Sequence, residues 1–299
     1  MNNFIEYFYN MKIDKIIYND KYYSFLYNNY FYRLYIVDDN VYINNVVSIN
    51  KEMLNNTLVS EIMANKDKEY ISYYNGYMYV LIKIYVNVNK KVTMEEISAL
   101  SNSLYRDKMS VNWGILWEKK IDYLEDLIGE NGKKYPLIVD SFNYFVGLAE
   151  NAISYYNNID NLSNYRYYIS HKVIRFDDTI QVIYNPLNII FDYRVRDIAE
   201  YVKNSFFNNN YNVMNELNRY LLTNNLSYTD VLLLVSRLLY PSFYFEMYED
   251  ILIDNKEEEI IINIVNRAEE YEAYLAMVIG FLHSRYNVPE IEWLKKAKY

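Results

Sequence analysis

The pattern of apolar and polar positions divides the chain into a strand-rich first part and a helical second part. Residues 12 to 47 are rich in Tyr, Ile and Val, and polar residues interrupt them at Asn19-Asp20, Asn28-Asn29 and Asp38-Asp39-Asn40. This pattern predicts a meander of strands joined by tight turns. Residues 51 to 65 predict one short helix with Met53 or Leu54, Leu58 and Ile62 on a common face. Residues 69 to 86 predict two more strands around Asn75-Gly76.

From residue 93 onwards the apolar positions follow a helical period. Thr93 and Glu96 have the spacing of a capping box, which predicts a helix start. An apolar stripe of Trp117, Ile121, Leu124 and Ile128 predicts a helix that ends at Gly129. Four further helices are expected at about residues 137–156, 211–223, 228–240 and 257–286, the third between a Ser227-x-x-Asp230 box and Pro241. The polar stretch 87–91 is the expected hinge between a small β-rich domain, residues 1–90, and a large helical domain, residues 91–299.

Composition and charge exclude several classes of protein. The chain has 299 residues, of which 52% are hydrophobic and 18% aromatic, and this predicts a packed globular protein. A formal net charge of −9 argues against nucleic acid or an anionic membrane as the main partner. The sequence has no cysteine, which excludes disulfides and thiolate metal sites. We find no apolar run of ~20 residues and no signal-peptide pattern, so we expect no membrane insertion and a cytoplasmic location.

The stretch from Ile169 to Asn204 has the most distinctive pattern in the sequence. His171 opens a loop, and two short apolar runs, residues 182–184 and 189–191, then flank Asn185-Pro186. These runs predict two strands joined by a turn, with Asp192 directly after the second strand. The apolar positions that follow predict one face of a helix: Val195, Ile198, Ala199, Val202 and Phe206.

This layout resembles the catalytic core of the protein-kinase-like phosphotransferases, in the branch that includes the aminoglycoside and choline kinases. His171 stands at the first position of the pattern H-G-D-x-x-x-x-N, and Asp178 stands at its asparagine position. Asp192 falls at the metal-binding aspartate, and Asp197-Ile198-Ala199 falls at the D-L-A motif that follows. The resemblance implies an α+β, protein-kinase-like two-lobe fold with a β-rich N-terminal lobe and a helical C-terminal lobe.

The chain is still more similar to the bacterial spore-coat kinase-like proteins of the YutH and CotS type. Their signature x-D-x-x-x-R-D-L-A-E-Y/W-I/V matches residues 191–202, and a second block matches residues 112–122. We expect the resemblance to extend over the whole chain; its specific motifs are these two segments. It implies an association with the spore coat or with sporulation.

One departure from the phosphotransferase pattern concerns catalysis. His171-Lys172-Val173 replaces H-G-D, so Val173 stands where the family has its general-base aspartate. That aspartate orients the attacking hydroxyl group and accepts its proton, which valine cannot do. The chain has six glycines and no Gly-rich loop between residues 12 and 40. Both features favour an inactive relative of the kinases.

The resemblance also suggests residues for nucleotide and metal binding. Arg33 is the candidate strand cation for nucleotide phosphates, with Glu61 on the predicted first helix as its partner; the alternative is that both are ordinary surface residues. Asp178 and Asp192 are the candidate ligands of a divalent metal. The alternative for Asp192 is a bond to Arg194, Arg196 or a backbone amide, because a buried carboxylate needs a partner.

Two more residues are expected to be structural rather than catalytic. His171 is expected to brace the metal-binding strand, as the family histidine does. Asp197 is expected to cap the following helix or to interact with its dipole.

Two functional interpretations follow. In the first, the chain is a degenerate kinase-like protein, a pseudokinase, that acts as a binding or assembly protein in the spore coat with a coat or other protein as partner. This interpretation expects no cofactor, and a purely structural coat component is compatible with it. In the second, the chain is an active phosphotransferase that uses ATP and Mg²⁺ on a small hydroxylated or sugar-like substrate. The missing base favours the first, and the presence of Asp178 and Asp192 favours the second.

Overall fold

The computed structural model describes residues 1–19, 22–55, 59–86, 89–107, 109, 111–131, 134–160, 162–175, 177–253 and 256–296. Its contacts divide the chain into two compact units. The first unit contains Met1–Leu104 and Ile169–Phe191, and the second contains Tyr105–Tyr168 and Asp192–Tyr299. The expected domain boundary near residue 90 is a different division of the chain and stays a prediction, and two residues of its hinge, 87 and 88, lie outside the described residues.

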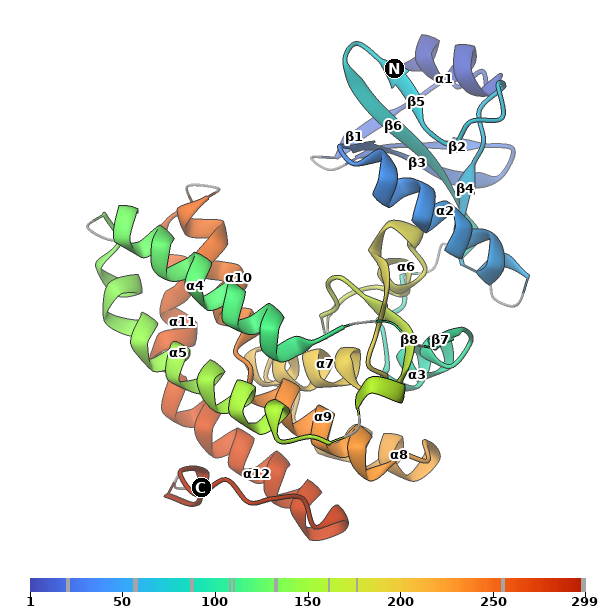
Figure 1. Ribbon diagram of the computed structural model, residues 1–299. Helices are drawn as coiled ribbons and strands as arrows, with labels where there is room; N and C mark the ends of the chain where they lie inside the picture. The colour runs from blue at the N-terminus through green and yellow to red at the C-terminus, as the bar shows by residue number, and fades with distance from the viewer. Residues whose placement is uncertain are drawn as a thin grey trace. The chain divides into compact units, whose positions relative to one another are not determined.

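The first unit combines an antiparallel sheet with four helices (Figure 1). Its strands are β1 (Ile17–Asn19), β2 (Tyr22–Tyr27), β3 (Tyr30–Val37), β4 (Glu61–Met63), β5 (Ser72–Tyr74) and β6 (Tyr77–Ile84). Its helices are α1 (Asn2–Tyr9), α2 (Asn40–Leu54), α3 (Met94–Ser101) and α6 (Ile180–Ile183), with a 3₁₀ turn at Pro186–Asn188.

The sheet of the first unit has a helix on each face. Its strands are ordered β1-β2-β3-β6-β4, with β5 also paired to β6, and all pairs are antiparallel. Side chains alternate between the faces of a strand, so Tyr79 and Leu81 of β6 pack in the cluster that contains α1. Val80 and Ile82 pack in the cluster that contains α2. Both faces of β6 are therefore buried.

The predicted hairpins of this unit are confirmed where the structure describes them. Asn28 and Asn29 have positive φ angles of 48° and 63° and join β2 to β3, while Asn75 and Gly76, at 49° and 81°, join β5 to β6. Asparagine and glycine are favoured there because they adopt positive φ at low cost. The turn predicted at Asn19-Asp20 includes Asp20, which lies outside the described residues.

The helix predicted for residues 51 to 65 is wrong in position. Helix α2 spans Asn40–Leu54 instead, because the Asp39 carboxylate accepts hydrogen bonds from the amides of Val41 (2.9 Å) and Tyr42 (3.0 Å) and caps the helix. The polar residues 38–40 were predicted as a turn between strands, but they start this helix. Glu61 and Ile62 belong to strand β4, and Leu58 lies outside the described residues.

The predicted hairpin around Asn185-Pro186 is also only half correct. Residues 189–191 do form a strand, in β9 (Ile189–Asp192), but the run 182–184 belongs to helix α6 and its C-cap. Short apolar runs do not distinguish a buried strand from a buried helical turn. β9 belongs to a three-stranded sheet ordered β7-β8-β9, with β7 at Tyr105–Asp107 and β8 at Arg166–His171.

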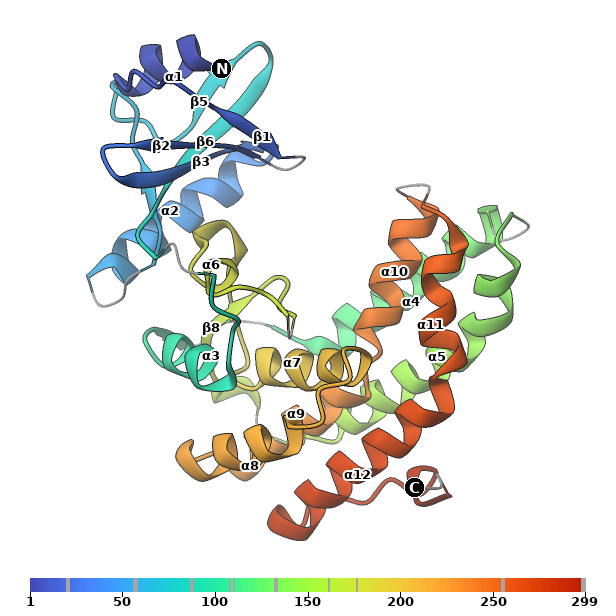
Figure 2. The same cartoon turned by 180° about the vertical axis from the view of Figure 1, so that it is seen from behind.

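The second unit is a group of packed helices (Figure 2). The helices are α4 (Trp113–Asn131), α5 (Pro136–Asn157), α7 (Arg196–Phe207), α8 (Val213–Thr223), α9 (Tyr228–Leu239), α10 (Ser242–Leu252), α11 (Ile262–Asn266) and α12 (Ala268–Tyr286). Short 3₁₀ helices occupy Leu162–Asn164, Glu258–Ile261 and Leu294–Lys296. No helix among the described residues is long and apolar enough to cross a membrane.

Sequence patterns predicted most of the helix starts correctly. Both capping boxes are present: Thr93 with Glu96 at α3 in the first unit, and Ser227 with Asp230 at α9. Helix α4 continues past Gly129, so this glycine does not end it. The predicted helix 257–286 is interrupted at Arg267, and α10, directly after Pro241, was not predicted.

Residues 112–122 form the aromatic centre of the second unit. The Trp117 ring stacks on Tyr240 with a centroid distance of 4.5 Å and on Trp113 with 5.3 Å. A Cβ atom at Gly114 would lie 2.5 Å from the Asn157 side-chain oxygen and 3.2 Å from the Tyr156 ring, so a larger residue there would force these side chains to move. The block is therefore part of the architecture of the second unit.

We expect Trp117→Ala to lower the free energy of unfolding by about 3–5 kcal/mol, because it removes a buried, stacked tryptophan. Leu116→Ala is the matched control, because Leu116 is next to it on α4 and is 54% exposed. This control should change the free energy by less than about 0.5 kcal/mol. Denaturant unfolding of both variants measures the difference. If both variants lose the same small amount of free energy of unfolding, Trp117 has a role other than stabilising the fold.

Candidate functional site

A polar pocket of about 740 Å³ in the first unit brings together three of the residues singled out from the sequence. They are Arg33 from β3, Val173 from the loop after β8, and Asp178 at the end of that loop. The remaining lining residues are mostly polar or aromatic: Tyr22, Tyr35, Lys172, Arg175, Thr179, Gln181, Val182, Asn185, Leu187 and Asn188. Glu61 is not among them.

Arg33 and Glu61 have different partners in the structure. The Arg33 guanidinium donates to the side-chain oxygen of Gln181 and lies 4.6 Å from the centre of the Tyr22 ring. Glu61 lies on β4 and not on a helix, and its carboxylate accepts a hydrogen bond from the Tyr85 hydroxyl. The expected pair between them is therefore not formed. A nucleotide-binding role for either residue stays a prediction.

The loop that carries Val173 is fixed by the Asn188 side chain. The Asn188 amide group donates to the Val173 carbonyl (2.8 Å), and its oxygen accepts from the Val173 amide (3.1 Å). The Lys172 amide donates to the Asn188 carbonyl (2.8 Å). The Val173 side chain, 43% exposed, lines the pocket with a group that has no proton-accepting atom. Sequence reasoning did not identify Asn188, because its bonds depend on the folded loop.

His171 and Asp178 support the same loop. His171 is fully buried, and its Nε2 atom lies 3.0 Å from the Ile183 carbonyl oxygen. It therefore contacts α6, and the expected bracing of the metal-binding strand stays a prediction. One Asp178 oxygen accepts a hydrogen bond from the Arg175 amide (2.7 Å). Burial raises the pKa of Asp178, and the bond from Arg175 opposes this rise.

Asp192, in the second unit, has partners for both carboxylate oxygens. Oδ1 accepts from the Trp113 indole (2.9 Å) and from the Tyr193 amide (2.7 Å). Oδ2 lies 3.1 Å from Arg196 Nε. Burial raises the pKa of Asp192, and the Arg196 and Arg237 cations oppose the rise. This arrangement matches the alternative stated for Asp192, a bond to Arg196 and a backbone amide.

Asp197 belongs to the same group of buried charges. It lies in the first turn of α7, although the N-cap position itself is Val195, so the capping role expected for Asp197 is wrong. Its carboxylate lies 3.3 Å from Arg196 Nη1. The expected interaction with the helix dipole is compatible with this position.

Glu200, Lys203 and Arg237 extend this group, and sequence reasoning did not identify them. Glu200 Oε1 lies 2.6 Å from Arg237 Nε and 3.1 Å from Lys203 Nζ, and Glu200 Oε2 accepts from the Ser242 hydroxyl (2.7 Å). Lys203 also donates to the Tyr240 carbonyl (2.8 Å). The available signal was the spacing of Glu200, in the signature segment, and Lys203, directly after it, which are three residues apart on one helix.

The pKa values of Glu200 and Lys203 reflect their burial and their mutual contact. Burial alone would raise the pKa of Glu200, but the Lys203 and Arg237 cations outweigh it and hold the pKa well below its usual range. Burial lowers the pKa of Lys203 to about 8, against the effect of Glu200. Both groups are therefore charged at neutral pH.

The predicted metal site at Asp178 and Asp192 stays a prediction. Asp178 belongs to the first unit and Asp192 to the second. Among the described residues, no group of three or more His, Cys, Asp or Glu side chains is arranged to hold a metal ion.

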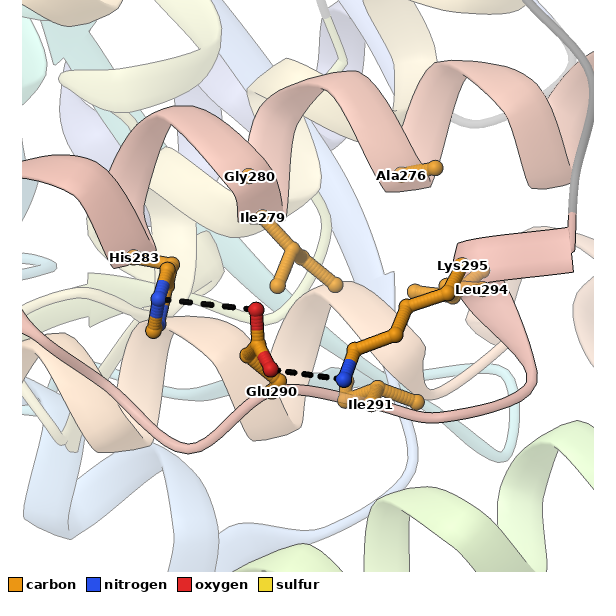
Figure 3. A pocket seen from close by; sticks show the side chains of 8 residues that line it. All are labelled: Ala276, Ile279, Gly280, His283, Glu290, Ile291, Leu294 and Lys295. Carbon is orange, nitrogen blue, oxygen red and sulfur yellow. Dashed lines mark ion pairs between the residues drawn. The ribbon is translucent and has the colours of Figure 1, made fainter.

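A second pocket, of about 170 Å³, lies in the second unit between α12 and the C-terminal segment (Figure 3). Glu290 points between two partners in this view: its carboxylate lies 3.6 Å from His283 Nε2 and 2.6 Å from Lys295 Nζ. The His283–Glu290 contact joins the C-terminal segment to α12, whereas the Glu290–Lys295 ion pair lies within that segment. The pocket contains none of the residues predicted for nucleotide or metal binding.

Comparison with known sequences assigns the family. Residues 2–278 match the sequence model of the family described as "Spore coat putative kinase YutH". The chain belongs to this family. One relative, the endospore coat-associated protein YutH of Bacillus subtilis (strain 168), is 29% identical over 210 residues. The aligned part is 62% of this chain and 62% of the relative, so the alignment covers less than two thirds of its length.

Solved structures share the fold. An aminoglycoside phosphotransferase from Alicyclobacillus acidocaldarius has a TM-score of 0.67 at 9% identity, with 92% of this chain and 94% of that chain covered. A spectinomycin phosphotransferase solved with ADP and spectinomycin has a TM-score of 0.54 at 10% identity, with 92% of each chain covered. The predicted α+β, protein-kinase-like fold and the predicted resemblance to the spore-coat kinase-like family are both confirmed.

The buried charges predict the effect of one conservative substitution. We expect Glu200→Gln to lower the free energy of unfolding by about 3–5 kcal/mol, because Lys203 and Arg237 then lack their buried counter-charge. The matched control is Glu150→Gln at an exposed position on α5. This control should change the free energy of unfolding by less than about 0.5 kcal/mol. Thermal or denaturant unfolding at neutral pH measures both, and similar stability of the two variants would contradict a structural role for Glu200.

Proposed function

We propose that this chain is a catalytically inactive, kinase-like member of the YutH family that acts by binding. The observation that carries the proposal is the coordination of Asp192. A metal-binding aspartate must offer carboxylate oxygens to the ion, but here Trp113 and Tyr193 contact Oδ1 and Arg196 contacts Oδ2. A divalent ion at Oδ2 would compete with the buried Arg196 guanidinium for that oxygen.

The position of Val173 supports the same proposal. Phosphoryl transfer to a hydroxyl group is assisted by a base that orients the hydroxyl and accepts its proton. Val173 lines the pocket at the position where the resemblance predicts that base. Among the described residues that line the pocket, the carboxylate nearest to Val173 in sequence is Asp178. One of its oxygens accepts a hydrogen bond from the Arg175 amide. The loss of a general base typically lowers the rate by about 10²–10⁴-fold.

The setting of this function is proposed from the family. The Bacillus subtilis relative is named as an endospore coat-associated protein. We infer that the present chain also associates with the coat of a spore and that its partner there is another coat protein. The net charge of −9 favours a protein or small-molecule partner over nucleic acid.

An active phosphotransferase remains the second candidate. Arg33 and Asp178 line the same pocket, and they are a cation and a carboxylate of the kinds that bind phosphate and magnesium. In this candidate function ATP and Mg²⁺ are required, and the substrate is a small hydroxylated or sugar-like molecule. The spectinomycin phosphotransferase of the same fold was solved with ADP.

Turnover of ATP distinguishes the two candidates. With ATP and Mg²⁺, we expect ADP release at the rate of the protein-free control, because the base is missing and Asp192 is engaged. We expect the same result for Val173→Asp, because a restored carboxylate at this position does not release Asp192 from Arg196.

ADP release above background by the wild-type chain that is lost in Asp192→Ala would overturn the proposal and support the phosphotransferase. The conclusion requires that ADP release is lost in Asp192→Ala, because this substitution would not affect the activity of a contaminating ATPase. The fold of each variant is checked by its circular dichroism spectrum before the assay.

A further inference from the structure

A third pocket, of about 750 Å³, is formed by the start of α4, the end of α5 and the first residues of β8. We call it the α4–α5 pocket, and its described lining residues all belong to the second unit. Its volume lies in the range of about 300–1,000 Å³ that is typical of ligand sites. It shares no described lining residue with the two pockets above, and neither candidate function uses it.

The described lining of the α4–α5 pocket carries no charged side chain. Its apolar part is formed by Met109, Val111, Ile115, Ile159 and Leu162. Met109 is 37% exposed and Ile115 is 49% exposed, so apolar surface is accessible from solvent at the rim. A charged ligand would lose its water here without gaining a counter-charge from the described lining, which is unfavourable.

Two asparagine amides supply the available polar groups of the pocket. A Cβ atom at Gly114 would lie 2.5 Å from Asn157 Oδ1 and 3.3 Å from Asn112 Oδ1, so both amides lie over the same glycine. Asn112 Oδ1 accepts a hydrogen bond from the Ile115 amide (3.1 Å). Within the described part of the chain, Asn112 Nδ2 and the Asn157 side chain have no hydrogen-bond partner. These groups can therefore bond to a ligand.

The two tyrosines of the lining, Tyr156 and Tyr167, are already engaged within the protein. Each is 3% exposed. The Tyr156 hydroxyl pairs with the Tyr193 hydroxyl (2.9 Å), and the Tyr167 hydroxyl donates to the Val111 carbonyl (3.5 Å). A sugar carries a hydroxyl group on most of its carbon atoms, and two asparagine amides would leave several of these without a partner. The lining therefore favours a ligand with few polar groups.

We propose that the α4–α5 pocket binds an uncharged, apolar peptide segment of a partner protein. Charged residues are depleted at the buried centre of protein interfaces, and the uncharged lining matches an uncharged segment. An asparagine amide presents a donor and an acceptor side by side, as a peptide group does, so Asn112 and Asn157 can bond to the main chain of the segment. This inference rests on the proposed binding function, for which it names the chemistry of the bound segment.

Three leucine derivatives with the same apolar side chain and different charges test the proposal. N-acetyl-leucinamide is uncharged, N-acetyl-leucine carries a carboxylate, and leucinamide carries an ammonium group at about pH 6. Ligand-observed NMR titration of the full chain should show saturable, millimolar binding of N-acetyl-leucinamide. Each charged derivative should bind at least about tenfold more weakly, because the pocket offers it no counter-charge.

Ile115→Glu locates the site, because it places a carboxylate at the rim of the pocket. Ile115 lies in the first turn of α4, where a carboxylate is compatible with the helix dipole. The variant should weaken binding of N-acetyl-leucinamide about fivefold and should favour leucinamide over it.

Leu116→Glu is the matched control, because Leu116 is next to Ile115 on α4, is 54% exposed and does not line the pocket. It should change the affinity by less than about twofold. Asn157→Asp keeps the shape of the side chain and should shift the preference toward leucinamide in the same direction. It provides a second variant if Ile115→Glu alters the fold.

Three outcomes would overturn the inference: no saturable binding of N-acetyl-leucinamide, equal affinity for the three derivatives, or equal weakening in Ile115→Glu and Leu116→Glu. N-acetylglucosamine is titrated in parallel. If it binds more tightly than N-acetyl-leucinamide and its binding is lost in Ile115→Glu, the pocket is a sugar site and the peptide assignment is wrong.

These outcomes are distinct from a failure of the proposed function, which is measured by ATP turnover. Absent turnover together with no binding of N-acetyl-leucinamide removes the peptide site alone. Turnover that depends on Asp192 removes the proposed function, whatever the leucine derivatives do.

Discussion

The structure of the second unit depends on a balance of buried charges around α7. Removing charged groups from water costs several kcal/mol each, and only close opposite charges and hydrogen bonds offset this cost. Here three carboxylates face three cations at the helix and its neighbours: Asp192, Asp197 and Glu200 with Arg196, Lys203 and Arg237. Arg237 also lies within 5.2 Å of the Trp113 ring centre, which connects these charges to the aromatic residues of α4. The signature segment of the family is therefore also the segment that folding requires.

This balance has a direct consequence for function. Both oxygens of the Asp192 carboxylate have partners within its own unit: Trp113 and Tyr193 at Oδ1 and Arg196 at Oδ2. Val173, at the position where the resemblance predicts the base, lines the pocket of the first unit. The proposed non-catalytic function rests on these two features.

Local signals in the sequence were sufficient for much of the fold. The capping boxes at Thr93 and Ser227 and the turns at Asn28-Asn29 and Asn75-Gly76 were predicted correctly, because their geometry is determined by neighbouring residues. The start of α2 was missed because Asp39, read as a turn residue, caps a helix whose buried face is chosen by packing on β6. Of the charge group, only the bonds of Asp192 to Arg196 and a backbone amide were stated beforehand, as an alternative to metal binding. Arg237 and Trp113 were not predicted, because they are distant from Asp192 in sequence and lie near it only in the folded unit.

The stability of Asp192→Asn in metal-free buffer tests the central claim most directly. An asparagine keeps the shape of the side chain but removes one of the two carboxylates that contact the buried Arg196. If Asp192 is part of the folding network, the free energy of unfolding should fall by about 3–5 kcal/mol. Asp122→Asn, at an exposed position on α4, should leave it nearly unchanged. An aspartate kept for metal binding carries an unfavourable charge when the metal is absent, so unchanged or increased stability of Asp192→Asn would contradict the account.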